Sequence, residues 1–315
     1  VPGFSFAWMS LISHRYYLPK LLEIPNKKGW SHIIDFLCEL LDFEGTYAQG
    51  RDFPKAITVM YQGTSRIFLA LLTDCPQLFI EYHYILCKHI PSSFVQIRNL
   101  VLSAFPEKMV LPDPLTQGLK VDRLPEIKEI PIFAVDPTDD MQRLGLKKLV
   151  DLYIKSASPA VLKGIASGFK LPSPKADSGL GFDVVTQDAA AFNTFVFYIG
   201  IKAVSGEKEK TNAPSSASDD EEPLAQFNRD SPYLALLSNL LLELSVEGRY
   251  FLCEAMANQL RYPNRHTHFF SCVILSLFGN YGTGVLGNSK VDIRHIITRV
   301  LLERIICNRP HPWGL

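Results

Sequence analysis

The chain has 315 residues, of which 47% are hydrophobic and 20% charged, a composition typical of an ordered globular protein of about two domains rather than a disordered or fibrous one. Lys plus Arg and Asp plus Glu both total 32, so the formal net charge is zero. A neutral chain gives no indication of binding to nucleic acid or to an anionic membrane, although it can still carry a local basic patch. The longest apolar segments, such as FFSCVILSLF, are too short and interrupted to cross a bilayer.

Apolar residues recur at helical spacing from the start of the chain. One stripe follows Ser31, which is the expected N-cap of its helix, and consists of Ile33, Phe36, Leu37, Leu40 and Leu41. After Pro91, Ser93 and Gln96 have capping-box spacing, and the next stripe consists of Phe94, Ile97, Val101 and Ala104. Further helices are predicted at 55–73, 77–90, 186–204, 233–245, 248–261, 267–278 and 291–307.

Strand-like alternation between turn dipeptides is nearly absent. Successive helices joined by short turns marked by Pro or Gly predict an all-α fold, an α-solenoid or irregular helical array. LLTDCPQLF and LLELSVEGRYF mark similar helix–turn–helix joints in the two halves, but they are too degenerate to establish a repeat.

Two segments interrupt the helical pattern. Residues 106–137 are rich in Pro but carry several leucines, which favours an ordered extended segment over a linker. Residues 205–223, SGEKEKTNAPSSASDDEEP, lack large apolar side chains and are predicted to be a disordered acidic and Ser-rich loop. The resulting division is an N-terminal helical block that ends in the extended segment, a connecting helical region, the loop and a truncated C-terminal helical block: 1–125, 126–204, 205–223 and 224–315.

The cysteines indicate the redox compartment, and the chain ends indicate whether the sequence is a fragment. Six cysteines form no CxxC pair and lie mostly in apolar helical runs, where Cys behaves as a small hydrophobe. This pattern favours a reduced intracellular compartment. The first residue is Val and the last residues, HPWGL, resemble the start of a helix, so we interpret the chain as a fragment whose missing targeting signal is uninformative.

The stretch GTGVLG satisfies the dinucleotide-binding pattern GxGxxG with Gly282, Gly284 and Gly287, and Glu303 follows at a suitable distance. That pattern works only within a βαβ unit, which presents a helix N-terminus to the pyrophosphate. The run before it continues a helical stripe and no second strand follows. A loop between helices is therefore the favoured interpretation.

The stretch RYPNRHTHFFSC places His266, His268 and Cys272 close together, and His268 and Cys272 are spaced to share a helix face. His83 and Cys87 repeat that spacing, but zinc needs three or four ligands and neither pair is completed nearby. A helix start with a packed cysteine is favoured over a metal site.

Motifs of catalysis are missing from the rest of the sequence. YQGTSR lacks the second glycine of a nucleophile elbow, and neither HExxH nor a phosphate-binding loop occurs. Basic and aromatic residues at 261–268 could stack on single-stranded RNA, which remains the alternative binding hypothesis.

Long stretches of the sequence nevertheless resemble one known family. These are FLALLTDCPQLFIEYHYILCKHIPSSFVQIRNLVLSAFPEKMVLPDPLTQGLKVDRLPEI, EGRYFLCEAMANQLRYPNRHTHFFSC, ITRVLLERIICNRPHPWGL and the opening VPGFSFAWMSLISHR. They resemble the C-terminal Not superfamily homology domain of the large Not scaffold subunit of the Ccr–Not mRNA deadenylase complex, over roughly half of the chain. Residues 126–232 match the family pattern poorly, the 205–223 loop looks lineage-specific, and the family continues past HPWGL.

The resemblance implies a HEAT-like irregular α-solenoid of antiparallel helix pairs, with no enzymatic activity and no cofactor or metal. It implies a scaffold that docks the two smaller Not-box subunits, and it leaves regulatory peptide motifs as further partners. The roles it implies are mRNA deadenylation, mRNA decay, translational repression and transcription regulation, in the cytoplasm and the nucleus.

Two stretches are the candidates for partner binding. In RYPNRHTHFFSC, Pro263 and Asn264 are expected to end one helix and Thr267 to cap the next, which leaves Tyr262, Arg265 and His266 exposed to a partner. A contact surface and a braced structural corner both fit this stretch. The candidate residues are Leu111, Pro112, Asp113, Lys120, Arg261, Tyr262, Asn264, Arg265, His266 and His268.

Overall fold

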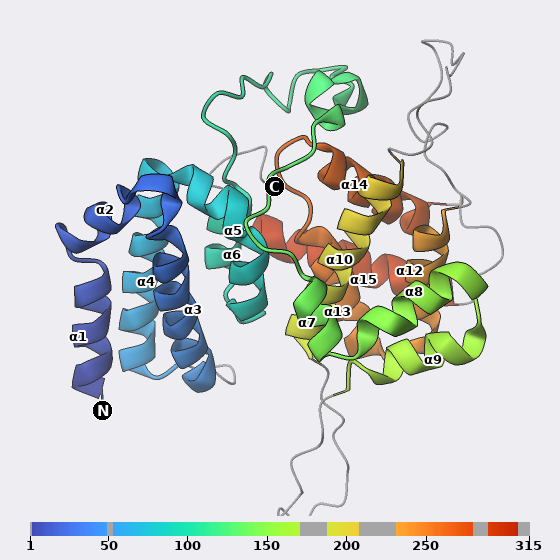
Figure 1. Cartoon of the computed structure of the whole chain (residues 1–315), viewed down its shortest axis with the longest axis horizontal. Coiled ribbons are helices and arrows are strands. Elements are labelled where there is room, and N and C mark those ends of the chain that lie inside the picture. Colours follow the sequence, from blue (N-terminus) through green and yellow to red (C-terminus); the bar gives the residue numbers. More distant parts are fainter. Residues whose placement is uncertain (1, 49–52, 171–187, 208–230, 280–288, 308–315) are drawn as a thin grey trace, which may run out of the picture. The chain divides into compact units, whose positions relative to one another are not determined.

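The computed structural model describes residues 2–48, 53–170, 188–207, 231–279 and 289–307 (Figure 1). In these residues the regular structure is helical and contains no β-strand, which confirms the prediction of an all-α fold. None of the described helices is long and apolar enough to cross a membrane. The GTGVLG stretch and HPWGL lie outside the described residues, as does most of the 205–223 loop.

The chain divides into two compact units. Unit 1 comprises residues 1–119, 132–135 and 303–315, and unit 2 comprises residues 120–131 and 136–302. The division into four segments made from the sequence remains a prediction.

Unit 1 is an array in which successive helices pack against one another. Its helices are α1 (Pro2–Ile12), α2 (Tyr17–Leu22), η1 (Pro25–Lys27), α3 (Trp30–Tyr47), α4 (Lys55–Asp74), α5 (Pro76–His89) and α6 (Val95–Leu102). Helices α1, α3 and α4 lie side by side in Figure 1, and α5 packs on α3, α4 and α6. The stripe predicted on α3 faces this core, because Ile33, Leu37, Leu40 and Leu41 are all buried.

Unit 2 is organised around one buried helix. Its helices are η2 (Val121–Arg123), η3 (Pro125–Lys128), α7 (Thr138–Arg143), α8 (Leu146–Ser156), α9 (Pro159–Ser167), α10 (Ala189–Glu207), α12 (Pro232–Glu243), α13 (Val246–Ala257), α14 (Arg265–Phe278) and the part of α15 (Ser289–Ile306) up to Leu302. Residues 191–200 of α10 are all buried, and α10 packs on α7, α13 and α14. Such a helix is apolar on nearly every side because it has neighbours on nearly every side.

The helix ends differ more from the predictions than the helices do. Ser31 lies inside α3, whose N-cap is Gly29, and α6 has Phe94 rather than Ser93 at its N-cap; neither cap residue makes a side-chain capping hydrogen bond. The two cap predictions are therefore wrong. Helices α1 and α2 were not predicted, and α7–α9 had no predicted bounds although they lie in the region 126–204 that was predicted to be helical. The short helices η2 and η3 interrupt the segment that was predicted to be extended.

Candidate functional site

The corner between α13 and α14, residues 258–268 of unit 2, carries six of the ten candidate residues. Four of them are buried: Arg261 and Tyr262 are each 4% exposed, and Asn264 and His266 are each 1% exposed. Arg265 and His268 are half-buried. The expectation that Tyr262 and His266 would be exposed to a partner is therefore wrong, because both are packed within unit 2.

Asn264 begins α14 and ties the corner to it. Its Oδ1 accepts a hydrogen bond from the Thr267 backbone N–H at 2.9 Å, and its Nδ2 donates to the Tyr262 carbonyl at 2.8 Å. Asn264 is thus the N-cap, the position where a side-chain oxygen satisfies a free helix N–H. The prediction that Thr267 caps this helix is wrong.

Thr267 instead closes the corner from inside. Its hydroxyl donates to the Gln259 carbonyl at 2.9 Å and accepts from Asn264 Nδ2 at 3.0 Å and from the Arg261 backbone N–H at 3.3 Å. The Arg265 backbone N–H donates to the Glu129 carbonyl at 2.9 Å, which ties the start of α14 to the residue after η3. A buried network satisfied in this way fixes one backbone path.

His266 fills the contact between α14 and α10. Its ring lies 5.7 Å from the ring of Phe197 and 5.1 Å from that of Phe270, edge to face in both cases. A Cβ atom added to Gly200 would lie 2.2 Å from His266 Nε2, so the ring occupies space that only glycine leaves free on α10. Burial, together with the positive charge of Arg261, lowers the pKa of His266 to about 3.

These contacts describe a braced corner rather than an open stacking surface. An aromatic ring stacks on a nucleobase only if one of its faces is exposed, and Tyr262 and His266 are buried. Single-stranded RNA binding therefore remains a prediction, but Tyr262 and His266 are too buried to supply the stacking contacts proposed for it.

The His and Cys pairs lie on helix faces as their spacing predicts. Cys272 Sγ is 3.8 Å from His268 Nε2 on α14, and His83 and Cys87 are both buried on α5. In the part of the chain that the structure describes, no three His, Cys, Asp or Glu side chains gather as a metal site would need.

The four remaining candidates lie on the segment between α6 and η2. Pro112, Asp113 and Lys120 are exposed, and Leu111 is half-buried. Asp113 holds a turn, since its Oδ1 accepts from the Leu115 backbone N–H at 2.9 Å. Leu115 is 82% exposed, so this leucine does not anchor the segment as the sequence suggested.

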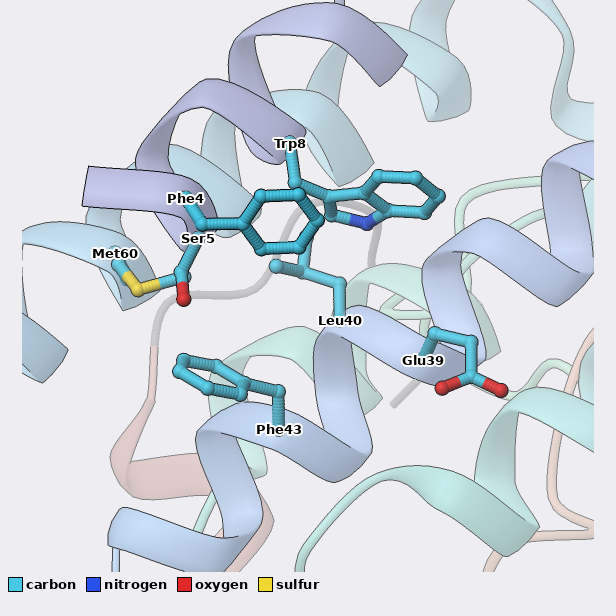
Figure 2. Close-up of a pocket in the computed structure, with 7 residues that line it drawn as sticks. All are labelled: Phe4, Ser5, Trp8, Glu39, Leu40, Phe43 and Met60. Carbon is cyan, nitrogen blue, oxygen red and sulfur yellow. The ribbon is translucent and has the colours of Figure 1, made fainter. Parts of the chain in front are cut away.

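Unit 1 also contains a recess that the sequence did not predict. It has a volume of about 410 Å³ and lies between α1, α3 and α4, where Figure 2 shows its seven lining residues: Phe4, Ser5, Trp8, Glu39, Leu40, Phe43 and Met60. Three aromatic rings and two aliphatic side chains make it a site for binding an apolar group. The missed signal was the apolar opening FSFAWMSLI, whose helix α1 went unpredicted.

The whole chain matches one protein family. The family model described as "CCR4-Not complex component, Not1" matches residues 1–315. The match therefore includes residues 126–232, which had resembled the family poorly.

Full-length relatives are similar along the entire chain. It is 35% identical over 315 residues to "General negative regulator of transcription subunit 1" of Saccharomyces cerevisiae, and 34% identical over 323 residues to "CCR4-NOT transcription complex subunit let-711" of Caenorhabditis elegans. Each alignment covers 100% of this chain, but only 14% of the yeast protein and 11% of the nematode protein.

Two solved structures have the same fold. The Not1 C-terminal domain in complex with Not4 is 35% identical with a TM-score of 0.80, and the NOT1 superfamily homology domain from Chaetomium thermophilum is 30% identical with a TM-score of 0.82. Each comparison covers 99% of this chain and 58% of the solved chain.

Proposed function

Because the chain belongs to the Not1 family of CCR4-Not complex components, we propose that it is a non-catalytic docking module for other subunits of that complex. The expected partners are the two smaller Not-box subunits. The observation that carries the proposal is the similarity, over 99% of this chain, to a Not1 C-terminal domain that was solved in complex with Not4.

The surfaces of the described residues suit such a role. Pro112, Asp113 and Lys120 are exposed on a segment without regular helix, and loops held by a rigid helical framework are common binding sites. The buried network around Thr267 supplies rigidity to unit 2 rather than contact area. Partners that lie along a helical array bind its ridges and grooves as extended or helical segments.

Through these subunits the module would support mRNA deadenylation, mRNA decay, translational repression and transcription regulation, in the cytoplasm and the nucleus. These roles belong to the complex, and this chain would contribute by holding subunits together.

The test uses the full-length scaffold subunit that contains this chain and asks whether it forms a complex with other subunits. The wild-type protein is mixed with the two smaller Not-box subunits, or with a Not4-type subunit, and each mixture is analysed by size-exclusion chromatography. A stoichiometric complex with at least one of them is expected. A folded scaffold that elutes alone from every mixture would overturn the proposal.

Two variants, one with three substitutions and one with two, locate the contact. A Pro112→Ala, Asp113→Lys, Lys120→Glu variant changes exposed side chains only, and we expect it to weaken the complex. An Asp139→Lys, Lys148→Glu variant is the matched control, since both side chains are exposed in α7 and α8 and neither belongs to the candidate segment.

A further inference from the structure

Unit 2 contains a polar hollow at the start of α13, the end of that helix opposite to the corner that leads into α14. The hollow has a volume of about 410 Å³ and lies where the end of α9 meets the turn between α12 and α13. Ala166 and Leu244 in its lining are buried, whereas every charged or hydroxyl-bearing lining residue is exposed. The hollow therefore has an apolar floor and a polar rim.

Two lysines line this hollow without an acidic partner. Lys163 and Lys170 are both exposed, and neither makes an ion pair with a described residue, although Glu243 also lines the hollow. Like charges that share a small volume repel each other, and an anion between them turns this repulsion into attraction. Two ammonium groups against one carboxylate leave the lining positive, so its electrostatic complement is an anion.

Neutral hydrogen-bond donors adjoin the lysines. Ser245 Oγ accepts a hydrogen bond from the Gly248 backbone N–H at 3.2 Å, and no described residue accepts the hydrogen of its hydroxyl. Ser245 is the N-cap of α13, so backbone N–H groups in the first turn of this helix lack intrahelical partners and add to the attraction for an anion. The Ser167 hydroxyl is already used, because it donates to the Lys163 carbonyl at 2.9 Å.

These donors fit a phosphate monoester better than a carboxylate. A phosphate monoester carries a charge of about −1.5 to −2 at neutral pH and has three terminal oxygens, whereas a carboxylate has one charge and two oxygens. The dianion can meet both ammonium groups at once and leave an oxygen for the Ser245 hydroxyl. A volume of about 410 Å³ also leaves space for the organic part of the ester, above the apolar floor.

We propose that this hollow binds a phosphate monoester, held by Lys163 and Lys170 with Ser245 as a neutral donor. The ester is a small phosphorylated molecule or a phosphorylated side chain of another protein, and both present the same dianion. The proposal goes beyond the docking function and does not rest on it, so its failure would leave that function standing.

Lysine footprinting of the full-length scaffold subunit that contains this chain tests the site, with phenyl phosphate as the probe. An N-hydroxysuccinimide ester acylates exposed lysines, and mass spectrometry gives the rate at each one. A probe concentration of a few times the dissociation constant should slow acylation of Lys163 and Lys170 roughly fivefold. Lys148 and Lys155, exposed on α8, should react as before.

Sodium chloride at the same ionic strength is the control for screening, which acts on every exposed lysine. It should protect none of the four lysines. Acylation of Lys163 and Lys170 at an unchanged rate in phenyl phosphate, or equal protection by chloride, would overturn the proposal.

Two variants and a control test the roles of the charges. Lys163→Gln should weaken phenyl phosphate binding roughly tenfold, read from the protection of Lys170, because a charge-assisted hydrogen bond is lost. Glu243→Gln should tighten binding roughly threefold because it removes the carboxylate from the lining, a gain that a folding defect does not produce. Asp139→Asn makes a similar change on an exposed residue of α7 outside the lining and should bind as the wild type does. Unchanged affinity in the two variants, or an equal gain in the control, would overturn the proposal.

Two further probes identify the source of the phosphate. If peptides with one central phosphoserine protect Lys163 and Lys170 at concentrations roughly tenfold lower than phenyl phosphate, the site takes a phosphorylated partner protein. Equal or weaker protection by these peptides would assign the site to small phosphorylated molecules, and the proposal holds in both cases. If single-stranded RNA protects the two lysines more strongly than either monoester, they bind a phosphodiester backbone and the proposal is overturned.

Discussion

Glu44 in unit 1 and His266 in unit 2 are both buried ionisable side chains, yet their surroundings differ. Glu44 is 0% exposed on α3, and its Oε1 accepts a hydrogen bond from the Thr64 hydroxyl of α4. Its Oε2 is buried and has no hydrogen-bond partner among the described residues. His266 is held by two aromatic rings on α10 and α14 and interacts with the backbone of Phe197.

Burial shifts both side chains toward their neutral forms in the folded protein, which has opposite consequences for the two units. Burial raises the pKa of Glu44 from 4.5 to about 7, with a smaller opposing effect of the Thr64 hydrogen bond, so the folded form of unit 1 favours the protonated acid. Burial lowers the pKa of His266 from 6.5 to about 3, so the folded form of unit 2 favours the unprotonated ring. Unit 1 should lose stability as the pH rises, and unit 2 as it falls.

The largest effect is expected from Glu44→Gln, which replaces the carboxyl by an amide that does not ionise. Because the folded pKa lies above the unfolded one, wild-type unit 1 has this contribution in full below about pH 4.5 and loses it as the pH rises through 7. The variant should raise the free energy of unfolding of unit 1 by about 3 kcal/mol at pH 8 and by about 1 kcal/mol at pH 5. Hydrogen exchange of α3 amides, corrected for intrinsic rates, measures this difference.

Glu39→Gln is the control for that measurement, because Glu39 is exposed on the same helix. It should leave α3 exchange unchanged at both pH values. A Glu44→Gln variant with the same gain at pH 5 and pH 8 would show that Glu44 does not titrate near neutrality.

The opposite pH dependence should appear in unit 2. The folded pKa of His266 lies below the unfolded one, so its contribution is complete above about pH 6.5 and is lost as the pH falls toward 3. Between pH 7 and pH 5 the free energy of unfolding of unit 2 should fall by about 2 kcal/mol, measured by exchange of α14 amides. His266→Gln should remove this pH dependence, whatever its cost at pH 7.

His32→Gln serves as the control, since His32 is exposed in unit 1. It should leave the pH dependence of α14 as it is in the wild type. If His266→Gln still loses stability between pH 7 and pH 5, the loss comes from other groups. The opposite pH dependence of the two units could then not be attributed to His266.

A smaller effect tests the close packing that keeps His266 buried. In Gly200→Ala the new Cβ would lie 2.2 Å from His266 Nε2 and 2.5 Å from Phe270 Cε2, and both rings are buried. We expect overpacking of roughly 2–3 kcal/mol, offset by about 1 kcal/mol of helix propensity, so unit 2 should be destabilised by between 1 and 2 kcal/mol. Thermal unfolding followed by circular dichroism measures the change.

Gly164→Ala on α9 is the matched control. A Cβ there would lie 3.6 Å from Leu149 Cδ1, an ordinary contact, so only the propensity gain remains. This variant should be more stable than the wild type by up to about 1 kcal/mol. If both alanines are tolerated equally, the α10–α14 contact is looser than its distances indicate.

Much of the fold could be predicted because helical periodicity is local. The stripes that begin at Ile33 and Phe94 are buried as their spacing indicates, apart from the half-buried Phe36. Most predicted helices lie within a few residues of α3–α6, α10 and α12–α15. The caps at Ser31 and Ser93 were predicted wrongly because those helices begin one residue before the first and two residues after the second. A cap requires a particular backbone geometry as well as a suitable side chain.

The candidate site was less predictable because its features depend on distant segments. His266 is buried because Gly200, on another helix, leaves space for its ring, and no spacing within RYPNRHTHFFSC contains that information. The recess of unit 1 likewise takes its lining from three separate helices. Exposure of an amphipathic side chain is decided by tertiary packing, which residue type alone does not determine.

The smallest effect on stability is expected from Ser245→Ala, a substitution in unit 2 that involves no ionisable group and so serves as a reference for His266. Ser245 caps α13, since its Oγ accepts from the Gly248 backbone N–H at 3.2 Å, and it is exposed. Ser245→Ala should cost about 1 kcal/mol or less at every pH between 5 and 8, because a serine hydroxyl does not ionise in that range. Ser158→Ala at the start of α9 is the control, as Ser158 holds the N-cap position without a side-chain capping bond and should cost less. Urea unfolding of both variants at pH 5 and pH 8 gives the comparison. A loss in Ser245→Ala that changed with pH would mean that destabilising unit 2 by any route makes it acid-sensitive, and the acid loss could then no longer be assigned to His266.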